Sequence, residues 1–291
     1  MPTRSRRRFD DDDFPPFTDH PYTAPDPEPD DAPDEPMWSS YPDATHGPAP
    51  LPDWVITSPG AIDTDLGVMK TGKEADVSLL RREFEGVTTL LAVKQYRDPQ
   101  HRLFHRDAGY LEGRRMRRSR ENRAMATRTE FGRDLISGQW AFAEFAVLSR
   151  LWQMGAAVPY PVQLSGTELM MEFIGDPGDD GGAATAAPRL AQLRPPVSEA
   201  RALYRQLREV LLVLAETGYA HGDLSAYNVL VHHGRLVLID LPQAMDLVGN
   251  PQGFGYLHRD CVNICSWFVA RGVPADPDEL CDELLRTVPH A

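Results

Sequence analysis

The stretch His221-Gly-Asp-Leu-Ser-Ala-Tyr-Asn228 decides the fold, because it places an aspartate five residues before an asparagine in a polar loop. Two short predicted strands with a turn at His233-Gly234 follow this loop, and Asp240 comes directly after the second strand. A short hairpin brings the residue before its first strand close to the residue after its second strand. We therefore expect Asn228 and Asp240 to lie side by side, with Asp223 near them.

These three residues have the chemistry of a phosphoryl-transfer site. Carboxylate and amide oxygens suit Mg²⁺, which binds few protein ligands and completes its octahedron with phosphates and water. Asn228 and Asp240 would share this ion, and Asp223 would accept the proton of a hydroxyl group. An Asp and an Asn in one loop, with a metal-holding Asp after it, are typical of protein kinases. All three could instead be ordinary turn residues, since Asp and Asn often cap hairpins and helices.

The region before this loop has the pattern of a sheet followed by a helix. Residues 62–69, 75–84 and 88–96 are predicted to form three strands of a meander. Residues 140–152 carry apolar side chains at helical spacing and should form a helix that packs on the meander.

Lys94 lies near the end of the third predicted strand, after the apolar run Leu90-Leu-Ala-Val93. A lysine at this position can reach the α- and β-phosphates of ATP, and the helical acid Glu144 would hold it there. Glu130 and Glu168 are alternatives for this ion pair. Lys94 and Glu144 could also be solvated charges on their strand and helix.

The remainder of the chain predicts two more strands and then mainly helices. Residues 175–196 are rich in Gly, Ala, Asp and Pro and should form a flexible connection. The other expected elements are strands at 162–164 and 168–174, an amphipathic helix at 198–217, and helices at 254–271 and 276–287. The fold class is therefore α+β.

With these motifs the chain resembles the RIO-type atypical serine kinases, over about residues 55–268. Lys70-Thr-Gly-Lys-Glu-Ala-Asp-Val77 is similar to that family's phosphate loop of the STGKEA type. Residues 221–228 are similar to its catalytic loop, and Leu238-Ile-Asp-Leu-Pro-Gln243 to its metal loop. The resemblance implies a two-lobed, protein-kinase-like fold with a small antiparallel-sheet lobe and a mainly helical large lobe.

The resemblance also implies roles for further residues. Met171-Glu-Phe-Ile-Gly175 resembles the hinge, so backbone groups of Glu172 and Ile174 would contact adenine, and Asp260 would brace the catalytic loop. The implied cofactors are ATP and Mg²⁺, with Mn²⁺ as an alternative. The expected catalytic residues are Asp223 and Lys94; the metal ligands are Asn228 and Asp240; and the ATP-binding residues are Thr71, Gly72, Lys73, Glu74, Ala75, Val77, Lys94, Glu144, Met171, Glu172 and Ile174. Lys73 could alternatively be a plain surface charge.

Three departures from common kinase patterns are informative. Lys70 stands where the family usually has Ser, so one hydroxyl contact to phosphate is not expected. No winged-helix pattern precedes the meander, which favours the STGKEA subfamily. Only 20 residues separate Asp240 from Asp260, without an Ala-Pro-Glu motif, so we expect no peptide-docking activation segment.

The charge and the prolines are concentrated near the N-terminus. Residues 1–53 hold 13 of the 26 prolines and contribute −9 of the net charge of −13. Such a segment buries too little apolar surface to offset its ordering entropy, and we expect residues 1–53 to be a disordered acidic tail. The expected domains that follow are a small lobe at 54–174, with a basic loop at 97–137, and a large lobe at 175–291.

Residues 97–128 hold ten arginines and four acids, which predicts phosphate contacts with RNA or a ribosomal particle. Alternatively, this segment is a solvated face or pairs with the acidic tail. Three cysteines provide no disulfide framework, and no apolar run approaches the roughly 20 residues of a membrane span. With no secretory signal pattern either, we expect a cytoplasmic protein without membrane contact.

The resulting hypothesis is an ATP-dependent phosphotransferase that acts on serine or threonine hydroxyls of a protein substrate, itself included. The missing activation segment favours one alternative, an ATPase switch in ribosome or ribonucleoprotein assembly. For that alternative the resemblance implies transient phosphorylation of Asp240. Two more are a small-molecule kinase of the aminoglycoside or choline type and a nucleotide-loaded scaffold that docks on RNA.

Overall fold

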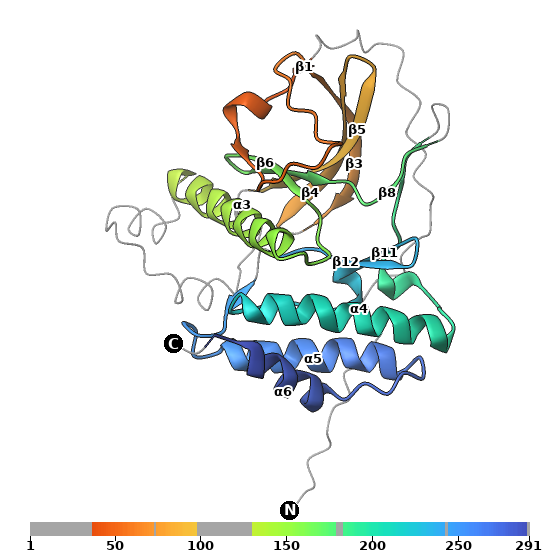
Figure 1. Cartoon of the computed structure of the whole chain (residues 1–291). Helices are drawn as coiled ribbons and strands as arrows, with labels where there is room; N and C mark the ends of the chain where they lie inside the picture. The colour runs from red at the N-terminus through yellow and green to blue at the C-terminus, as the bar shows by residue number, and fades with distance from the viewer. Residues whose placement is uncertain (1–36, 73, 98–129, 179–182, 242–243, 290–291) are drawn as a thin grey trace, which may run out of the picture.

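A sheet with one long helix lies above a group of helices, so that the molecule has two lobes (Figure 1). The computed structural model describes residues 37–72, 74–97, 130–178, 183–241 and 244–289 of the 291. The predicted α+β class and the two-lobed, kinase-like arrangement are confirmed.

Within the described residues, seven strands form the sheet of the small lobe in the order β1-β3-β4-β5-β7-β6-β2. Their bounds are β1 Met37–Trp38, β2 Thr45–His46, β3 Ile62–Thr71, β4 Ala75–Phe84, β5 Val87–Tyr96, β6 Pro161–Ser165 and β7 Glu168–Glu172. Strands β3, β4 and β5 are the predicted meander, and β6 and β7 are the two further strands that the sequence indicates. The central position of β5, between β4 and β7, fixes Lys94 from both sides.

The structure differs from the sequence prediction at residues 37–53, which are not part of a disordered tail. Strand β1 pairs with the start of β3, β2 pairs with β6, and Tyr41 is 6% exposed and stacks on His46. The prediction was wrong here because it averaged composition over the acidic, proline-rich stretch, whereas a few aromatic residues suffice to anchor its last part to the sheet. Residues 1–36, the rest of the predicted tail, lie outside the described residues.

A buried ion pair ties this lobe together. Arg82 is 0% exposed and donates to both carboxylate oxygens of Asp63, at 2.7 and 2.8 Å. It also donates to Oε1 of Gln163 at 3.0 Å, and the Gln163 amide donates to Oγ of Ser40 at 2.8 Å. One network therefore joins β3, β4, β6 and the segment that was predicted to be disordered.

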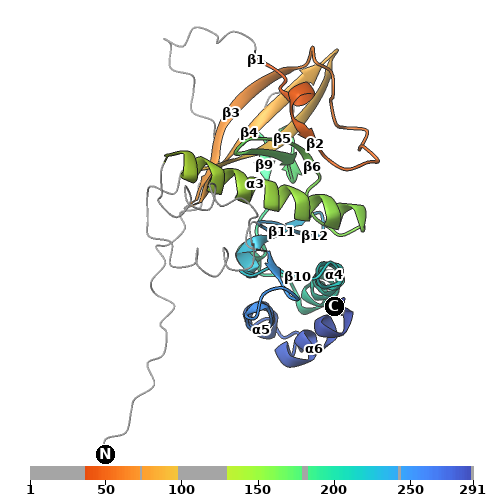
Figure 2. The ribbon, with the colours of Figure 1, turned by 90° about the vertical axis from the view of Figure 1, so that its left-hand side faces the viewer.

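Helix α3, Glu130–Gln153, runs beneath the sheet and above the large lobe (Figure 2). Trp140, Phe145, Leu148 and Leu151 on its apolar side are buried, as the helical spacing predicts, but Phe142 is 58% exposed. The helix carries Glu144 to a position beneath β5, where it is 1% exposed.

The large lobe is built on helices α4 Val197–Glu216, α5 Gly253–Val269 and α6 Pro277–Thr287. The predicted apolar stripe of α4 is buried throughout, and its members are Leu203, Leu207, Val210, Leu211 and Leu214. Cys261 and Cys265 of α5 and Cys281 of α6 are free, buried thiols. They pack as small apolar groups in the core.

Short elements connect the lobes and frame the catalytic loop. They are β8 Gly175–Asp176, β9 Thr185–Ala186, the 3₁₀ turn η5 Leu190–Gln192, β10 Tyr219–Ala220, η6 Ala226–Asn228, β11 Val229–His232, β12 Arg235–Leu238 and β13 Met245–Asp246. The connection predicted to be flexible thus contains the paired strands β8 and β9. None of the described helices is long and apolar enough to cross a membrane.

Candidate active site

Lys94 of β5 lies between two carboxylates. Its Nζ donates to Glu144, at 3.0 Å from Oε1 and 2.8 Å from Oε2, and to Oδ1 of Asp240 at 2.7 Å. Lys94 is 8% exposed, so this contact is shielded from water. The structure therefore places Glu144 beside Lys94, as the sequence predicts, and adds a contact between Lys94 and Asp240 that the sequence does not show.

The charges in this cluster stabilise one another. Burial lowers the pKa of Lys94, but the neighbouring Asp240 and Glu144 carboxylates outweigh burial and hold the pKa above its usual value. Burial likewise raises the pKa of Asp240, yet the Lys94 ammonium overcomes this and holds the pKa well below the usual range. Both side chains are consequently charged at neutral pH.

Glu144 connects the small lobe to the loop after β12. Its Oε1 accepts from the backbone N–H of Leu241 at 3.0 Å, and the Tyr96 hydroxyl donates to its Oε2. Burial and the neighbouring Glu144 carboxylate raise the pKa of Tyr96 well above its usual value, so the hydroxyl keeps its proton for this bond. Tyr96 is a supporting residue that sequence reasoning missed, although its place two residues after Lys94 on the same strand face was a usable signal.

The hairpin brings Asn228 and Asp240 together, as its length predicts. The backbone N–H of Ile239 donates to the carbonyl of Asn228 at 3.0 Å, and Val229 pairs with Leu238 across the ladder. Asp240 itself has a φ of +67°, in the left-handed region that Asp tolerates better than most residues. From this backbone position its carboxylate reaches Lys94.

Asp260 of helix α5 accepts hydrogen bonds from the backbone of the predicted catalytic loop, residues 221–228. Its Oδ2 accepts from the Gly222 amide at 2.7 Å and its Oδ1 from the Leu224 amide at 2.9 Å. Asp223, between these two amides, has an exposed side chain. Its backbone carbonyl accepts from Nδ2 of Asn228 at 2.9 Å. The bracing that the family resemblance implies is therefore present, and it leaves the Asp223 carboxylate at the surface.

The predicted phosphate loop joins β3 to β4. The Gly72 amide donates to the Ala75 carbonyl at 2.9 Å, and a Cβ on Gly72 would lie 2.8 Å from that oxygen, so a side chain does not fit. Thr71 pairs with Asp76, and Val77 lies opposite Lys94 in the ladder.

Glu74 and Lys73 are further members of the predicted phosphate loop. The carbonyl of Glu74 accepts from the Arg97 amide at 2.9 Å, while the Arg97 guanidinium binds Asp76. Lys73 lies outside the described residues. Of the arginine-rich segment 97–128, the structure describes only Arg97.

Two more cations lie near Asp240. The pKa of Lys70 is lowered by burial and then by Arg189, while Asp240 acts in the opposite direction. Burial also lowers the pKa of Arg189, against the effect of Asp240, and its guanidinium donates to the Tyr227 carbonyl at 2.6 Å. Lys70, Lys94 and Arg189 together make a cationic environment suited to phosphate groups. Arg189 was missed because it lies in the segment that was predicted to be a flexible connection.

The predicted hinge comprises the last two residues of β7 and the three residues after them. Met171 pairs with Ala92 of β5, and the Glu172 amide donates to the Tyr160 carbonyl at 2.9 Å. The carbonyl of Ile174 accepts from the Ala187 amide at 2.9 Å. Burial raises the pKa of the Glu172 side chain, whose Oε2 accepts from the Tyr160 amide at 3.1 Å.

This arrangement defines a protein-kinase-like, ATP-dependent phosphotransferase. It combines two lobes, the ion pair of Lys94 with Glu144, and a braced loop that carries Asp223 and Asn228 and precedes Asp240. The family model described as the RIO domain matches residues 89–280. The chain belongs to the RIO family of serine/threonine-protein kinases.

Individual relatives agree with this assignment. The RIO-type serine/threonine-protein kinase Rio1 of Haloferax volcanii is 35% identical over 227 residues, which cover 77% of this chain and 70% of that protein. The serine/threonine-protein kinase RIO3 of Caenorhabditis elegans is 30% identical over 223 residues, but this chain spans only 39% of its length. A solved complex of the Rio2 kinase from Chaetomium thermophilum with ADP, Mg²⁺ and phosphoaspartate has the same fold, with a TM-score of 0.54 at 23% identity over 76% of this chain and 60% of that one.

Proposed function

We propose that this chain transfers the γ-phosphate of ATP to serine and threonine hydroxyls of a protein substrate, and to its own. The observation that carries the proposal is the position of Lys94, whose Nζ lies 2.8 Å from Glu144 and 2.7 Å from Asp240. This places a fixed positive charge at the junction of the two lobes. Phosphoryl transfer depends mainly on positioning and charge neutralisation, which such a charge provides.

Asn228 and Asp240 fit a magnesium ion by their chemistry. Asp240 is ionised, and its side chain is 37% exposed. The amide nitrogen of Asn228 is committed to the Asp223 carbonyl, which leaves its oxygen as the ligand atom. Bound Mg²⁺ would neutralise charge on the phosphates, and Mn²⁺, which also accepts oxygen ligands, is the alternative ion.

Lys94 would bind the inner phosphates of ATP, with Glu144 and Tyr96 holding its position. Asp223 would orient the substrate hydroxyl and take its proton as the oxygen attacks the γ-phosphorus and ADP leaves. Asp260 supports this step through the amides on either side of Asp223.

Adenine would bind at the hinge through the carbonyl of Glu172 and the amide of Ile174. The other backbone groups of these two residues are already used within the fold. The Glu172 amide donates to the Tyr160 carbonyl, and the Ile174 carbonyl accepts from the Ala187 amide. Thr71, Gly72, Ala75 and Val77 would cover the phosphates and the base from above.

The substitution Asp223→Ala tests the proposal. We expect it to abolish acid-stable labelling of serine and threonine from γ-labelled ATP while the protein still binds ATP, since substitution of an exposed side chain usually changes stability little. The matched control is Asp282→Ala, which removes an exposed carboxylate from α6 and should leave labelling unchanged. Normal labelling by the Asp223 variant would overturn the assignment.

An ATPase switch is the second candidate, because the partly exposed carboxylate of Asp240 lies against Lys94 and could itself attack the γ-phosphorus. ADP would leave, and water would then hydrolyse the resulting acyl phosphate. Label that hydroxylamine removes, lost in Asp240→Asn, would support this candidate over transfer to serine. Binding of RNA or a ribosomal particle through residues 97–128 stays a prediction.

A further inference from the structure

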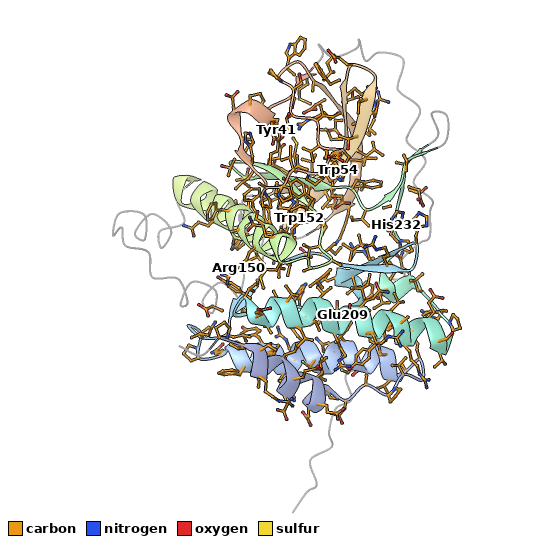
Figure 3. The ribbon with its side chains drawn as sticks, viewed as in Figure 1. Tyr41, Trp54, Arg150, Trp152, Glu209 and His232 are labelled. Atoms are coloured by element: carbon orange, nitrogen blue, oxygen red, sulfur yellow. The ribbon has the colours of Figure 1, made fainter. Side chains whose placement is uncertain are left out.

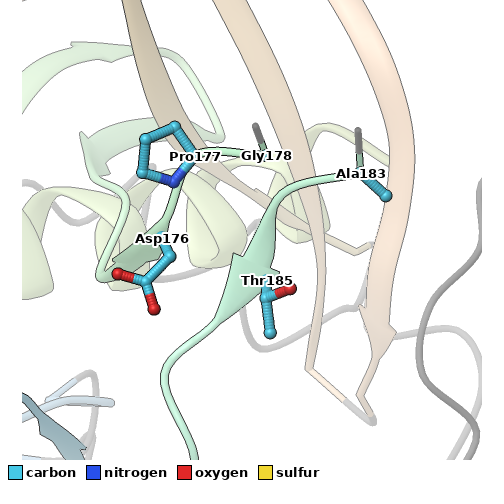
Figure 4. A pocket seen from close by; sticks show the side chains of 5 residues that line it. All are labelled: Asp176, Pro177, Gly178, Ala183 and Thr185. Atoms are coloured by element: carbon cyan, nitrogen blue, oxygen red, sulfur yellow. The ribbon is translucent and has the colours of Figure 1, made fainter. Parts of the chain in front are cut away.

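Two imidazoles and a carboxylate meet where the hairpin of β11 and β12 lies against β8. Asp176 is the last residue of β8, His232 ends β11, and His233 begins the turn that follows. Oδ1 of Asp176 lies 3.0 Å from Nε2 of His232 and 3.0 Å from Nε2 of His233. His232 is labelled at the right of Figure 3, and the Asp176 carboxylate is shown beside β9 in Figure 4.

The turn explains why neighbouring histidines reach the same carboxylate. Successive side chains of a strand point to opposite faces, so a straight continuation of β11 would separate the two rings. His233 and Gly234 instead have φ values of +49° and +74°, which turn the chain back after β11. The ring centroids are consequently only 4.0 Å apart.

The pairing of β8 with β9 fixes the backbone that carries the Asp176 carboxylate. Gly175 precedes Asp176, and a Cβ at Gly175 would lie 2.3 Å from the Thr185 carbonyl, so β8 and β9 approach as closely as they do only with glycine. Asp176 pairs with Thr185, so its backbone is held against β9.

We propose that Asp176, His232 and His233 form a binding site for a divalent metal ion of the zinc class. Two imidazole nitrogens and one carboxylate oxygen are the protein ligands of open zinc sites, in which water takes the fourth position. Ligand atoms around a tetrahedral zinc with bonds of about 2.0–2.1 Å lie about 3.3 Å apart, close to the distances from Asp176 to each ring. The three ligand atoms already lie within 4.8 Å of one another, and exposed side chains at His233 and Asp176 leave room for water.

Such an ion would join two parts of the chain that the proposed catalysis depends on. Asp176 follows the hinge directly, and the hairpin that carries His232 and His233 begins after Asn228 and ends before Asp240. A bound ion would fix the tip of this hairpin to β8. Hydrogen bonds between the histidines and Asp176 could hold the same groups without metal, and the experiment must separate these two cases.

The test is a zinc titration of the full chain without a histidine tag, against a chromophoric chelator and with Mg²⁺ in excess to fill the proposed catalytic site. We expect one equivalent of Zn²⁺ to bind and to raise the melting temperature until that equivalent is reached. His232→Ala or Asp176→Asn should weaken binding by at least about 100-fold, since even the outer partners of metal ligands are worth 10–100-fold.

His258→Ala is the matched control, because His258 also lies 3.0 Å from an exposed carboxylate, that of Asp278, and among the described residues no second imidazole joins this pair. It should bind zinc as the unaltered chain does. The buried cysteines are present in every variant, so a thiol site would survive all the substitutions. Absence of stoichiometric binding at micromolar zinc, or unchanged binding by His232→Ala and Asp176→Asn, would overturn the proposal.

Discussion

Glu144→Gln is the most informative single substitution at the junction of the lobes. It preserves shape and an oxygen acceptor for the Leu241 amide but removes the charge that lies 2.8 Å from Lys94. The ammonium then has one carboxylate partner, Asp240, and we expect it to move toward that residue and away from the phosphate position.

The magnitude follows from the burial of the pair. Removing one partner of a buried ion pair costs about 3–5 kcal/mol, and we take the lower end because Asp240 still balances the charge of Lys94. If this loss appears in the transition state, about 3 kcal/mol corresponds to a fall in kcat/KM for ATP of about 100-fold. Urea unfolding of the same variant would show how much of the loss appears in stability instead.

Glu168→Gln is the control, since Glu168 is the other described acid that the sequence offered as a partner for Lys94. The structure places it in β7 opposite Gln95, so we expect a change of no more than about twofold, as for substitutions away from such contacts. Full activity in Glu144→Gln, or an equal loss in Glu168→Gln, would refute the role assigned to Glu144.

Three further expectations concern stability. Asp63→Asn should lower the free energy of unfolding by about 3–5 kcal/mol in urea denaturation, because it leaves the fully buried Arg82 without its carboxylate; a loss below about 1 kcal/mol would contradict this. The pKa of Asp240 is lower in the folded state than its unfolded value of about 3.9, so its ionised form stabilises the fold above that value and this effect is lost as the pH falls toward the folded pKa. In Asp240→Asn, the free energy of unfolding should therefore depend less on pH below about pH 4. Its pH dependence between about pH 5 and 8 should not change. Deleting residues 1–53 should lower the melting temperature more than deleting residues 1–36 does, because only the longer deletion removes the Ser40 and Tyr41 contacts; equal melting temperatures for the two deletions would count against a structural role for residues 37–53.

The parts of the site that local spacing controls were predictable from the sequence. A hairpin of fixed length places Asn228 beside Asp240 regardless of what surrounds it. Lys94 follows the apolar run Leu90–Val93 within a strand whose apolar character indicates a central position in the sheet. The stripe of α4 was predictable for the same reason, since helical periodicity alone selects its buried face.

Long-range contacts were not predictable in this way. Arg189 contacts the carbonyl of Tyr227, 38 residues away, and nothing in the composition around it indicates that contact. Residues 37–53 were misjudged because the strand edges that receive them, in β3 and β6, lie elsewhere in the chain. The cluster of Asp176 with His232 and His233 likewise depends on a backbone turn and a distant strand pair.

The measurement that tests the central claim most directly is incubation of the purified chain with γ-labelled ATP and Mg²⁺, with label on protein and released phosphate counted separately. The account predicts acid-stable label on serine or threonine that accumulates with time and disappears in Asp223→Ala. Released phosphate alone, or neither labelled protein nor released phosphate, would contradict the assignment of this chain as a protein kinase.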